Sequence, residues 1–122
     1  MARPKQKQPV CKPRFRVLQG DHIALGPGKV DLLESIERTG SISKGARELN
    51  LSYRRAWDLV HTINQCFKNP VVHKTVGGKH GGGAYLTPFG KRLIRLYRTM
   101  ELKAAKASLN EWKSICRKLK KT

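Results

Sequence analysis

The sequence predicts a mainly α-helical domain with one small β-hairpin. Three patterns predict it: two adjacent segments with helical apolar spacing and a tight turn between them, two β-prone segments separated by glycines, and a long apolar seam that follows a Thr-Pro helix start. A chain of 122 residues is long enough for one modest core. We expect a basic N-terminal arm over residues 1–20, a folded domain over 21–87 and a C-terminal helical segment over 88–122.

The charge balance indicates the class of partner. Lysine and arginine number 26 against 8 aspartates and glutamates, a formal net charge of +18. A globular fold does not need this excess of positive charge, and the electrostatic field that it creates attracts polyanions. Nucleic acid is therefore the leading partner class, and an anionic membrane surface is the second. We expect no membrane insertion, because no run of about 18 apolar residues exists. The basic N-terminus lacks an apolar signal core, so a cytoplasmic location is expected.

Three segments precede the central helix pair. Residues 1–20 are rich in lysine and arginine and contain no acidic residue, which is typical of a tail or a loosely docked arm. Residues 21–26 alternate apolar and polar or small side chains, as a short strand does. The following segment places Val30, Leu33 and Ile36 at helical spacing, and Gly40 is suited to closing that helix.

Two helices joined by a tight turn are predicted next. Ser41 can cap a short helix that runs through about Leu49. Asn50 tolerates a left-handed turn, and Ser52 can cap a second, longer helix. The apolar stripe of that second helix is Ala56, Val60, Ile63 and Phe67, widened by Trp57 and Leu59. This arrangement describes a helix-turn-helix.

The start of the second helix carries polar side chains away from its apolar stripe. Arginine can bind guanine O6 and N7 with two parallel hydrogen bonds, and tyrosine can reach a phosphate or a thymine methyl. The alternative is a solvated face on which Arg54 and Arg55 pair with Asp58. In a chain with a charge of +18 we favour DNA contact. The predicted contact residues of the two helices are Ser41, Ser43, Ser52, Tyr53, Arg54, Arg55 and Asp58.

A glycine-rich segment lies between two β-prone segments, residues 71–76 and 84–87. It is therefore predicted to be the tip of a hairpin, a wing whose glycines let backbone amides approach phosphates. Lys74, Lys79 and His80 add positive charge. A tip without contacts is the alternative, and an enzyme loop is disfavoured because neither GxxxxGK[ST] nor GxGxxG is present. The wing glycines are Gly77, Gly78, Gly81, Gly82 and Gly83.

A long last helix is predicted to begin with Thr87 as its cap and Pro88 as its first residue. Ser108 and Glu111 resemble a capping box, so a kink or a new helix is expected near residue 108. An apolar seam along the helix has little of its own domain to pack against, and this predicts a homodimer. The seam residues are Leu93, Leu96, Met100, Ala104 and Ala107.

These residues also carry a family resemblance. Residues 26–67, with the motif SYRRAWD, and the glycine segment leading into LTPFG resemble the N-terminal DNA-binding domain of ModE-type molybdate-responsive transcriptional regulators. That domain is a winged helix-turn-helix related to the one in LysR-type regulators, and the resemblance covers roughly residues 21–107. It implies operator binding as a homodimer, with Ser52 to Asp58 opening the recognition helix and Val76 to Gly83 forming the wing.

The sequence therefore predicts a dimeric, sequence-specific transcriptional regulator that binds double-stranded DNA at the bacterial nucleoid. Full-length members of the family carry C-terminal oxyanion-binding domains, and none is visible after residue 107, so molybdate binding is not expected. The four histidines show no spacing that pairs them as a catalytic or metal set, and no enzyme activity, cofactor or metal is predicted. Two alternatives stay open: an architectural nucleoid protein held largely by phosphate contacts, and a modulator that heterodimerises with a full-length regulator.

Overall fold

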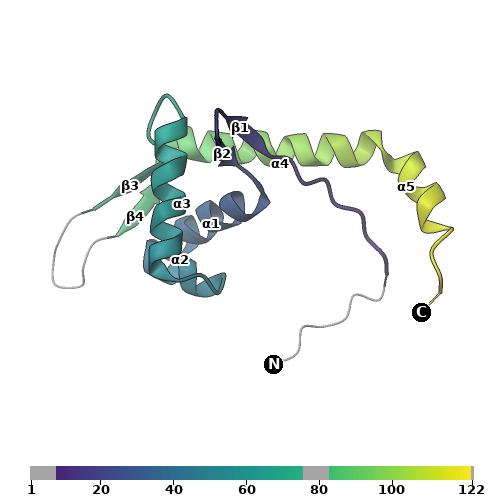
Figure 1. The fold of residues 1–122 in the computed structure, drawn as a ribbon, viewed down its shortest axis with the longest axis horizontal. Helices are drawn as coiled ribbons and strands as arrows, with labels where there is room; N and C mark the ends of the chain where they lie inside the picture. The colour runs from purple at the N-terminus through teal and green to yellow at the C-terminus, as the bar shows by residue number, and fades with distance from the viewer. Residues whose placement is uncertain (1–7, 76–82, 122) are drawn as a thin grey trace.

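A computed structural model describes residues 8–75 and 83–121 of the chain (Figure 1). Within these residues there are five helices and two small antiparallel sheets of two strands each. The predicted α-rich domain with small β elements is confirmed at this level. In chain order the elements are β1 (Val17–Gln19), β2 (His22–Leu25), α1 (Pro27–Thr39), α2 (Ile42–Glu48), α3 (Tyr53–Cys66), β3 (Val72–Lys74), β4 (Ala84–Leu86), α4 (Pro88–Ala107) and α5 (Leu109–Cys116).

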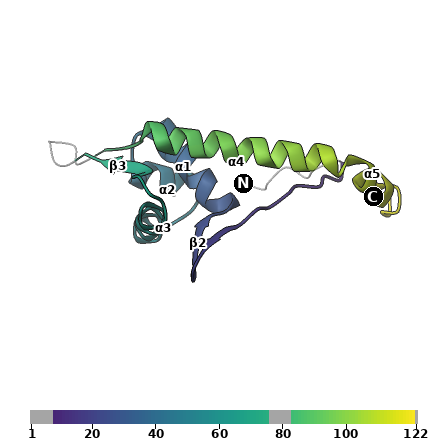
Figure 2. The ribbon, with the colours of Figure 1, turned by 90° about the horizontal axis from the view of Figure 1, so that it is seen from above.

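The core lies where α1, α2 and α3 meet the first half of α4. On α1 and α3 the buried side chains follow the predicted apolar spacing, including Val30, Leu33 and Ile36 on α1 and Val60 on α3. On α4 the buried side chains are Ile94 and Tyr97, which the predicted seam did not include. Tyr97 brings α4 into the same cluster. The second half of α4 continues past α1–α3, and α5 follows at the far end (Figures 1 and 2). Among the helices of the described residues, none is long and apolar enough to cross a membrane.

Local capping chemistry sets the bounds of α2 and α3, as the sequence predicts. The Ser41 hydroxyl accepts a hydrogen bond from the backbone amide of Lys44, and the Ser52 hydroxyl accepts one from Arg55. Asn50, in the turn between the two helices, has a positive φ of 57°, which asparagine tolerates better than most residues. These two caps and one turn residue fix where α3 begins, and so which side chains stand in its exposed first turn.

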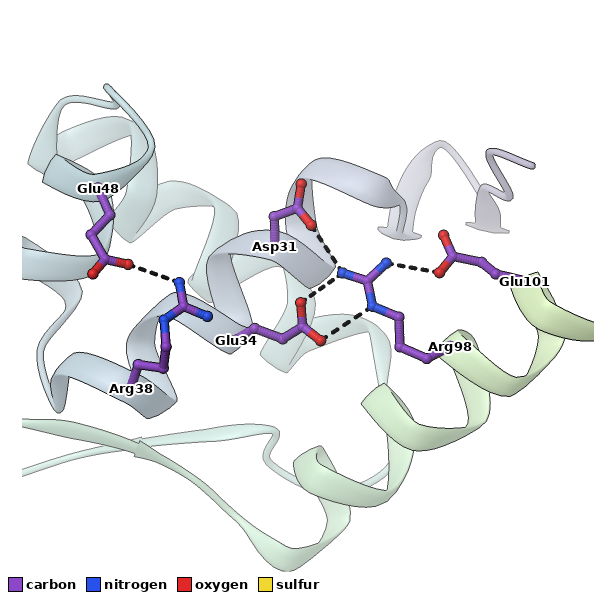
Figure 3. A network of polar contacts seen from close by, with 6 residues as sticks. All are labelled: Asp31, Glu34, Arg38, Glu48, Arg98 and Glu101. Atoms are coloured by element: carbon purple, nitrogen blue, oxygen red, sulfur yellow. Dashed lines mark hydrogen bonds and ion pairs between the residues drawn. The ribbon is translucent and has the colours of Figure 1, made fainter. Parts of the chain in front are cut away.

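A short polar network joins α1 and α2, and Figure 3 shows its ion pair between Arg38 and Glu48. The buried Ser35 hydroxyl donates to Glu48 Oε1 at 2.5 Å, and Arg38 donates to the same oxygen at 2.9 Å. Gly45 allows this approach of α2 to α1, because a Cβ there would lie only 3.1 Å from Ile36 Cγ1. The hydrogen bond from Ser35, assisted by Arg38, lowers the pKa of Glu48 below its usual value of 4.5.

We expect the stabilising effect of Glu48 to depend on pH. Because the pKa of this carboxyl is lower in the folded chain than in the unfolded one, its contribution is present above about pH 4.5 and is lost as the pH falls through the folded value. The difference in urea midpoint between the wild type and Glu48→Gln should therefore shrink on acidification. Glu111→Gln is the control, since Glu111 makes no ion pair within the described residues. A Glu48→Gln difference that stays constant down to about pH 3 would contradict this.

The N-terminal segment is more ordered than the sequence indicates. Val17–Gln19 forms β1, which pairs with β2, and the turn between them uses Gly20 at a φ of 58°. Phe15 packs against the core, and its carbonyl oxygen accepts a hydrogen bond of 2.8 Å from the Tyr97 hydroxyl. The predicted strand over 21–26 is confirmed as β2, but its partner strand lies inside the segment that was expected to be an arm.

A single arginine ties α4 to α1 (Figure 3). Arg98 lies 2.6 Å from Glu34, 2.9 Å from Asp31 and 2.8 Å from Glu101. These hydrogen bonds, above all the one to Glu34, raise the pKa of Arg98 further above its ordinary value. The network joins residues on both helices, and together with the Lys91–Glu37 ion pair and the buried Tyr97 it holds α4 against α1.

The break after α4 is confirmed, but its chemistry differs from the prediction. α4 ends at Ala107 and α5 begins at Leu109. The Ser108 hydroxyl does not cap α5; it donates back to the carbonyl oxygen of Ala104 at 2.8 Å. The expected capping box with Glu111 is therefore wrong, because the Ser108 hydroxyl is engaged with the last turn of α4 and does not accept from an amide of α5.

Candidate nucleic-acid interface

The first turn of α3 is an exposed cationic surface. Tyr53 is 56% exposed and the Arg54 side chain 82%, and Arg55 is exposed beside them. The opposite side of α3 carries Ala56, which is fully buried. Arg54 Nε lies 3.4 Å from Asp58 Oδ1, so the pairing that the alternative interpretation requires is present. Such an exposed pair contributes little and can be exchanged for other partners.

Trp57 differs from its predicted place in the apolar stripe. Its ring is half-buried and faces cations: Lys74 Nζ lies 4.3 Å from the ring centroid, and Arg54 Cζ lies 6.0 Å away. The His61 ring stacks on it with centroids 5.0 Å apart. Lysine over a tryptophan face is a cation–π contact, and here it links β3 to α3. The contact with Lys74 could not be read from spacing, because it joins two separate elements.

The hairpin of β3 and β4 is fixed to the helices at its base. The Ala84 amide donates to the Gly40 carbonyl at 2.9 Å, which attaches β4 to the end of α1. Asn64 of α3 accepts hydrogen bonds from the amides of Val71 and Val72 and donates to the Val72 carbonyl. Asn64 gives no signal in the sequence, because its partners lie on another element. These contacts place Lys74, at the end of β3, beside the start of α3.

Part of the predicted wing lies outside the described residues, namely Val76, Gly77, Gly78, Lys79, His80, Gly81 and Gly82. Gly83 is described, and its amide donates to the Thr75 hydroxyl at 2.6 Å. The hairpin itself is confirmed by the pairs Val72–Leu86 and His73–Tyr85.

Several predicted contact residues meet around one concavity, which we call the hydroxyl pocket. It lies between the start of α2, the start of α3 and the base of the hairpin, and its volume is about 290 Å³. Thr75 is the member that the sequence analysis missed, since an isolated threonine after a strand gives no signal. The polar and glycine residues that line the pocket are Ser41, Ser43, Tyr53, Lys74, Thr75 and Gly83.

The predicted seam on α4 divides into two parts. Leu93 is partly buried against the core, whereas Leu96 is 57% exposed and Met100 38%. Ala104 is half-buried and Ala107 exposed, in the last turns of α4. The seam beyond Leu93 is thus an apolar surface that the described part of the chain leaves largely open.

The fold and this surface define a small, basic, α-rich domain with an exposed cationic helix start. No protein-family model matches the chain. Among the described residues, no group of three or more His, Cys, Asp or Glu side chains could hold a metal ion.

The chain is similar in sequence to several characterised bacterial proteins. The chain is 46% identical over 99 residues to the molybdenum-pterin-binding protein MopB of Rhodobacter capsulatus, covering 81% of this chain and 37% of that protein. It is 43% identical over 79 residues to the molybdenum transport protein ModE of Azotobacter vinelandii, covering 65% and 29%. It is 46% identical over 71 residues to the DNA-binding transcriptional dual regulator ModE of Escherichia coli strain K12, covering 58% and 27%.

These relatives support a ModE-related family, and the chain spans between 27% and 37% of their lengths. Their names describe regulators, a transport protein and molybdenum-binding proteins, and none describes an enzyme. No molybdate binding was expected from the sequence. That expectation is contradicted, because relatives of this chain are molybdenum-pterin-binding proteins by name.

Proposed function

We propose that this domain is a winged helix-turn-helix that binds double-stranded DNA and regulates transcription. α2 and α3 are the helix-turn-helix, α3 is the recognition helix, and the hairpin of β3 and β4 is the wing. The observation that carries the proposal is the exposed first turn of α3, with Tyr53, Arg54 and Arg55, on a helix whose other side is buried in the core. Support also comes from the match to a DNA-binding transcriptional regulator.

The proposal includes a homodimer formed along the open part of the α4 seam. A dimer would present two recognition helices to successive major grooves, about 34 Å apart or a multiple of that. In this arrangement α2, α3 and the hairpin bind DNA, and the part of α4 beyond the core, with the basic residues that follow it, provides the dimer helix and a tail. The site of action would be the bacterial nucleoid in the cytoplasm.

The net charge of +18 favours one second candidate, an architectural protein that binds DNA mainly through phosphates. The two candidates differ in sequence preference. The names of the relatives also make molybdate a ligand to test for this chain, both alone and with DNA.

The proposed function is tested by selecting bound duplexes from a random pool and comparing the selected duplex with a scrambled one. Arg55 makes no ion pair within the described residues, so it is the cleaner base-contacting residue. We expect Arg55→Ala to reduce the discrimination between the two duplexes by about 1–3 kcal/mol, because one bidentate base contact is lost. Arg95→Ala, an exposed arginine on α4, is the matched control and should leave discrimination unchanged.

Selection that yields no shared motif, with Arg55→Ala weakening both duplexes equally, would favour the architectural candidate. Failure of the wild type to retain any duplex at physiological salt would reject both candidates.

A further inference from the structure

We propose that the hydroxyl pocket holds one phosphate group of the DNA backbone. The inference rests on the proposed function, since it assigns a specific ligand group to one part of the same surface. It differs from base contact by α3, because a phosphate contact positions the protein on the duplex without selecting its sequence.

Two hydroxyls of the pocket have their acceptor side already engaged. Ser41 Oγ accepts from the Lys44 amide at 3.1 Å, and Thr75 Oγ1 accepts from the Gly83 amide at 2.6 Å. A hydroxyl that accepts a hydrogen bond still has its own hydrogen to donate. The Ser41 hydroxyl donates to no protein acceptor within the described residues, and the same holds for Thr75. Both oxygens are therefore prepared to donate to an anion in the pocket.

The other polar groups that line the pocket are also hydrogen-bond donors or positively charged. The hydroxyls of Ser43 and Tyr53 make no hydrogen bond within the described residues, and both side chains are exposed. Lys74 also lines the pocket and adds a positive charge, and its ammonium group lies over the Trp57 ring, 4.3 Å from the ring centroid. No carboxylate is found among the described residues that line it. Hydroxyl donors with one ammonium and no competing anion suit an oxyanion and exclude a metal cation.

The place of the pocket favours a phosphate group that belongs to a polymer. Tyr53 belongs both to the pocket and to the exposed first turn of α3. A duplex whose major groove receives α3 therefore passes the mouth of the pocket. The pocket also spans the helix pair and the base of the hairpin, so one phosphate would fix the wing and the recognition helix in the same register.

The first measurement compares four variants on the selected and scrambled duplexes over a salt series. Ser43→Ala and Tyr53→Phe should each weaken both duplexes equally, by about tenfold, with the salt slope unchanged, because a neutral donor to a charged oxygen is lost. Lys74→Ala should weaken both and reduce the slope of log affinity against log salt by about 0.9. Thr99→Ala is the control and should leave both affinities unchanged, because Thr99 is an exposed hydroxyl residue on α4, outside α2, α3 and the hairpin.

The second measurement replaces single phosphates of the selected duplex by neutral methylphosphonates. We expect one position at which the replacement weakens the wild type but has almost no further effect on Ser43→Ala, since the two changes remove the same contact. If no position couples to Ser43 while the wild type still prefers the selected duplex, the pocket assignment fails and the proposed function stands. If the wild type binds no duplex, both fail.

The third arm tests free oxyanions. Sodium molybdate and inorganic phosphate are titrated separately against the DNA-free protein and against the complex, with wild type and Ser43→Ala. We expect neither ion to displace the duplex at micromolar concentration. Saturable, Ser43-dependent binding of molybdate that displaces the duplex would overturn the assignment to a DNA phosphate and make the free ion the ligand.

Discussion

Gly90→Ala is expected to destabilise the folded domain by about 2–3 kcal/mol, although alanine is the better helix former. Gly90 is buried in the first turn of α4, and a Cβ at this position would overlap the carbonyl oxygen of Val71. That carbonyl cannot move aside freely, because it accepts a hydrogen bond of 3.0 Å from the Thr87 amide. The clash is with backbone, so side-chain rotation cannot relieve it. Urea unfolding at neutral pH measures the loss.

Gly28→Ala is the matched control for this prediction. Gly28 lies in the first turn of α1, and a Cβ there would meet nothing within 4 Å. The same substitution should therefore leave stability unchanged or raise it by about 0.5–1 kcal/mol, the ordinary gain from replacing glycine in a helix. Equal unfolding midpoints for the two variants would show that the contact between α4 and Val71 is not as close as the structure places it.

The local elements could be predicted because their signals are local. Ser41, Ser52 and Thr87 each accept a hydrogen bond from an amide three residues further on, and each marks the helix start that the sequence indicates. β1 was missed for the opposite reason. Val17–Gln19 is a three-residue strand next to basic residues, and only its pairing with β2 and the anchoring of Phe15 by Tyr97 make it part of the fold.

The candidate site could be predicted in its residues but not in its assembly. Exposed polar side chains at the start of α3 follow directly from its apolar stripe. The hydroxyl pocket does not, because it joins Ser43, Tyr53 and Thr75 from three separate parts of the chain. The contact of Trp57 with Lys74 and the network around Arg98, which reaches Glu34 across 64 residues, have the same origin. Periodicity identifies which side of a helix is buried, but it does not identify the partner.

The second large effect is expected at the proposed dimer seam. Leu96→Glu should raise the dissociation constant of the dimer by about 100-fold or more, because a carboxylate would be placed without a partner in an apolar interface. The monomer should keep its stability, since Leu96 is 57% exposed in the single chain. Sedimentation equilibrium measures the dimer, and gel shift on the selected duplex measures the consequence for DNA binding.

Leu102→Glu separates an interface effect from a general effect of added negative charge. Leu102 is 72% exposed and lies six residues after Leu96, on a different side of α4. The Leu102→Glu substitution should leave both the dimer and DNA binding nearly unchanged. Loss of DNA binding in Leu96→Glu without loss of the dimer would mean that this side of α4 contacts DNA instead. A wild type that sediments as a monomer at tens of micromolar, with and without the duplex, would remove the dimer from the proposal, because two recognition helices could then not be held one turn of DNA apart.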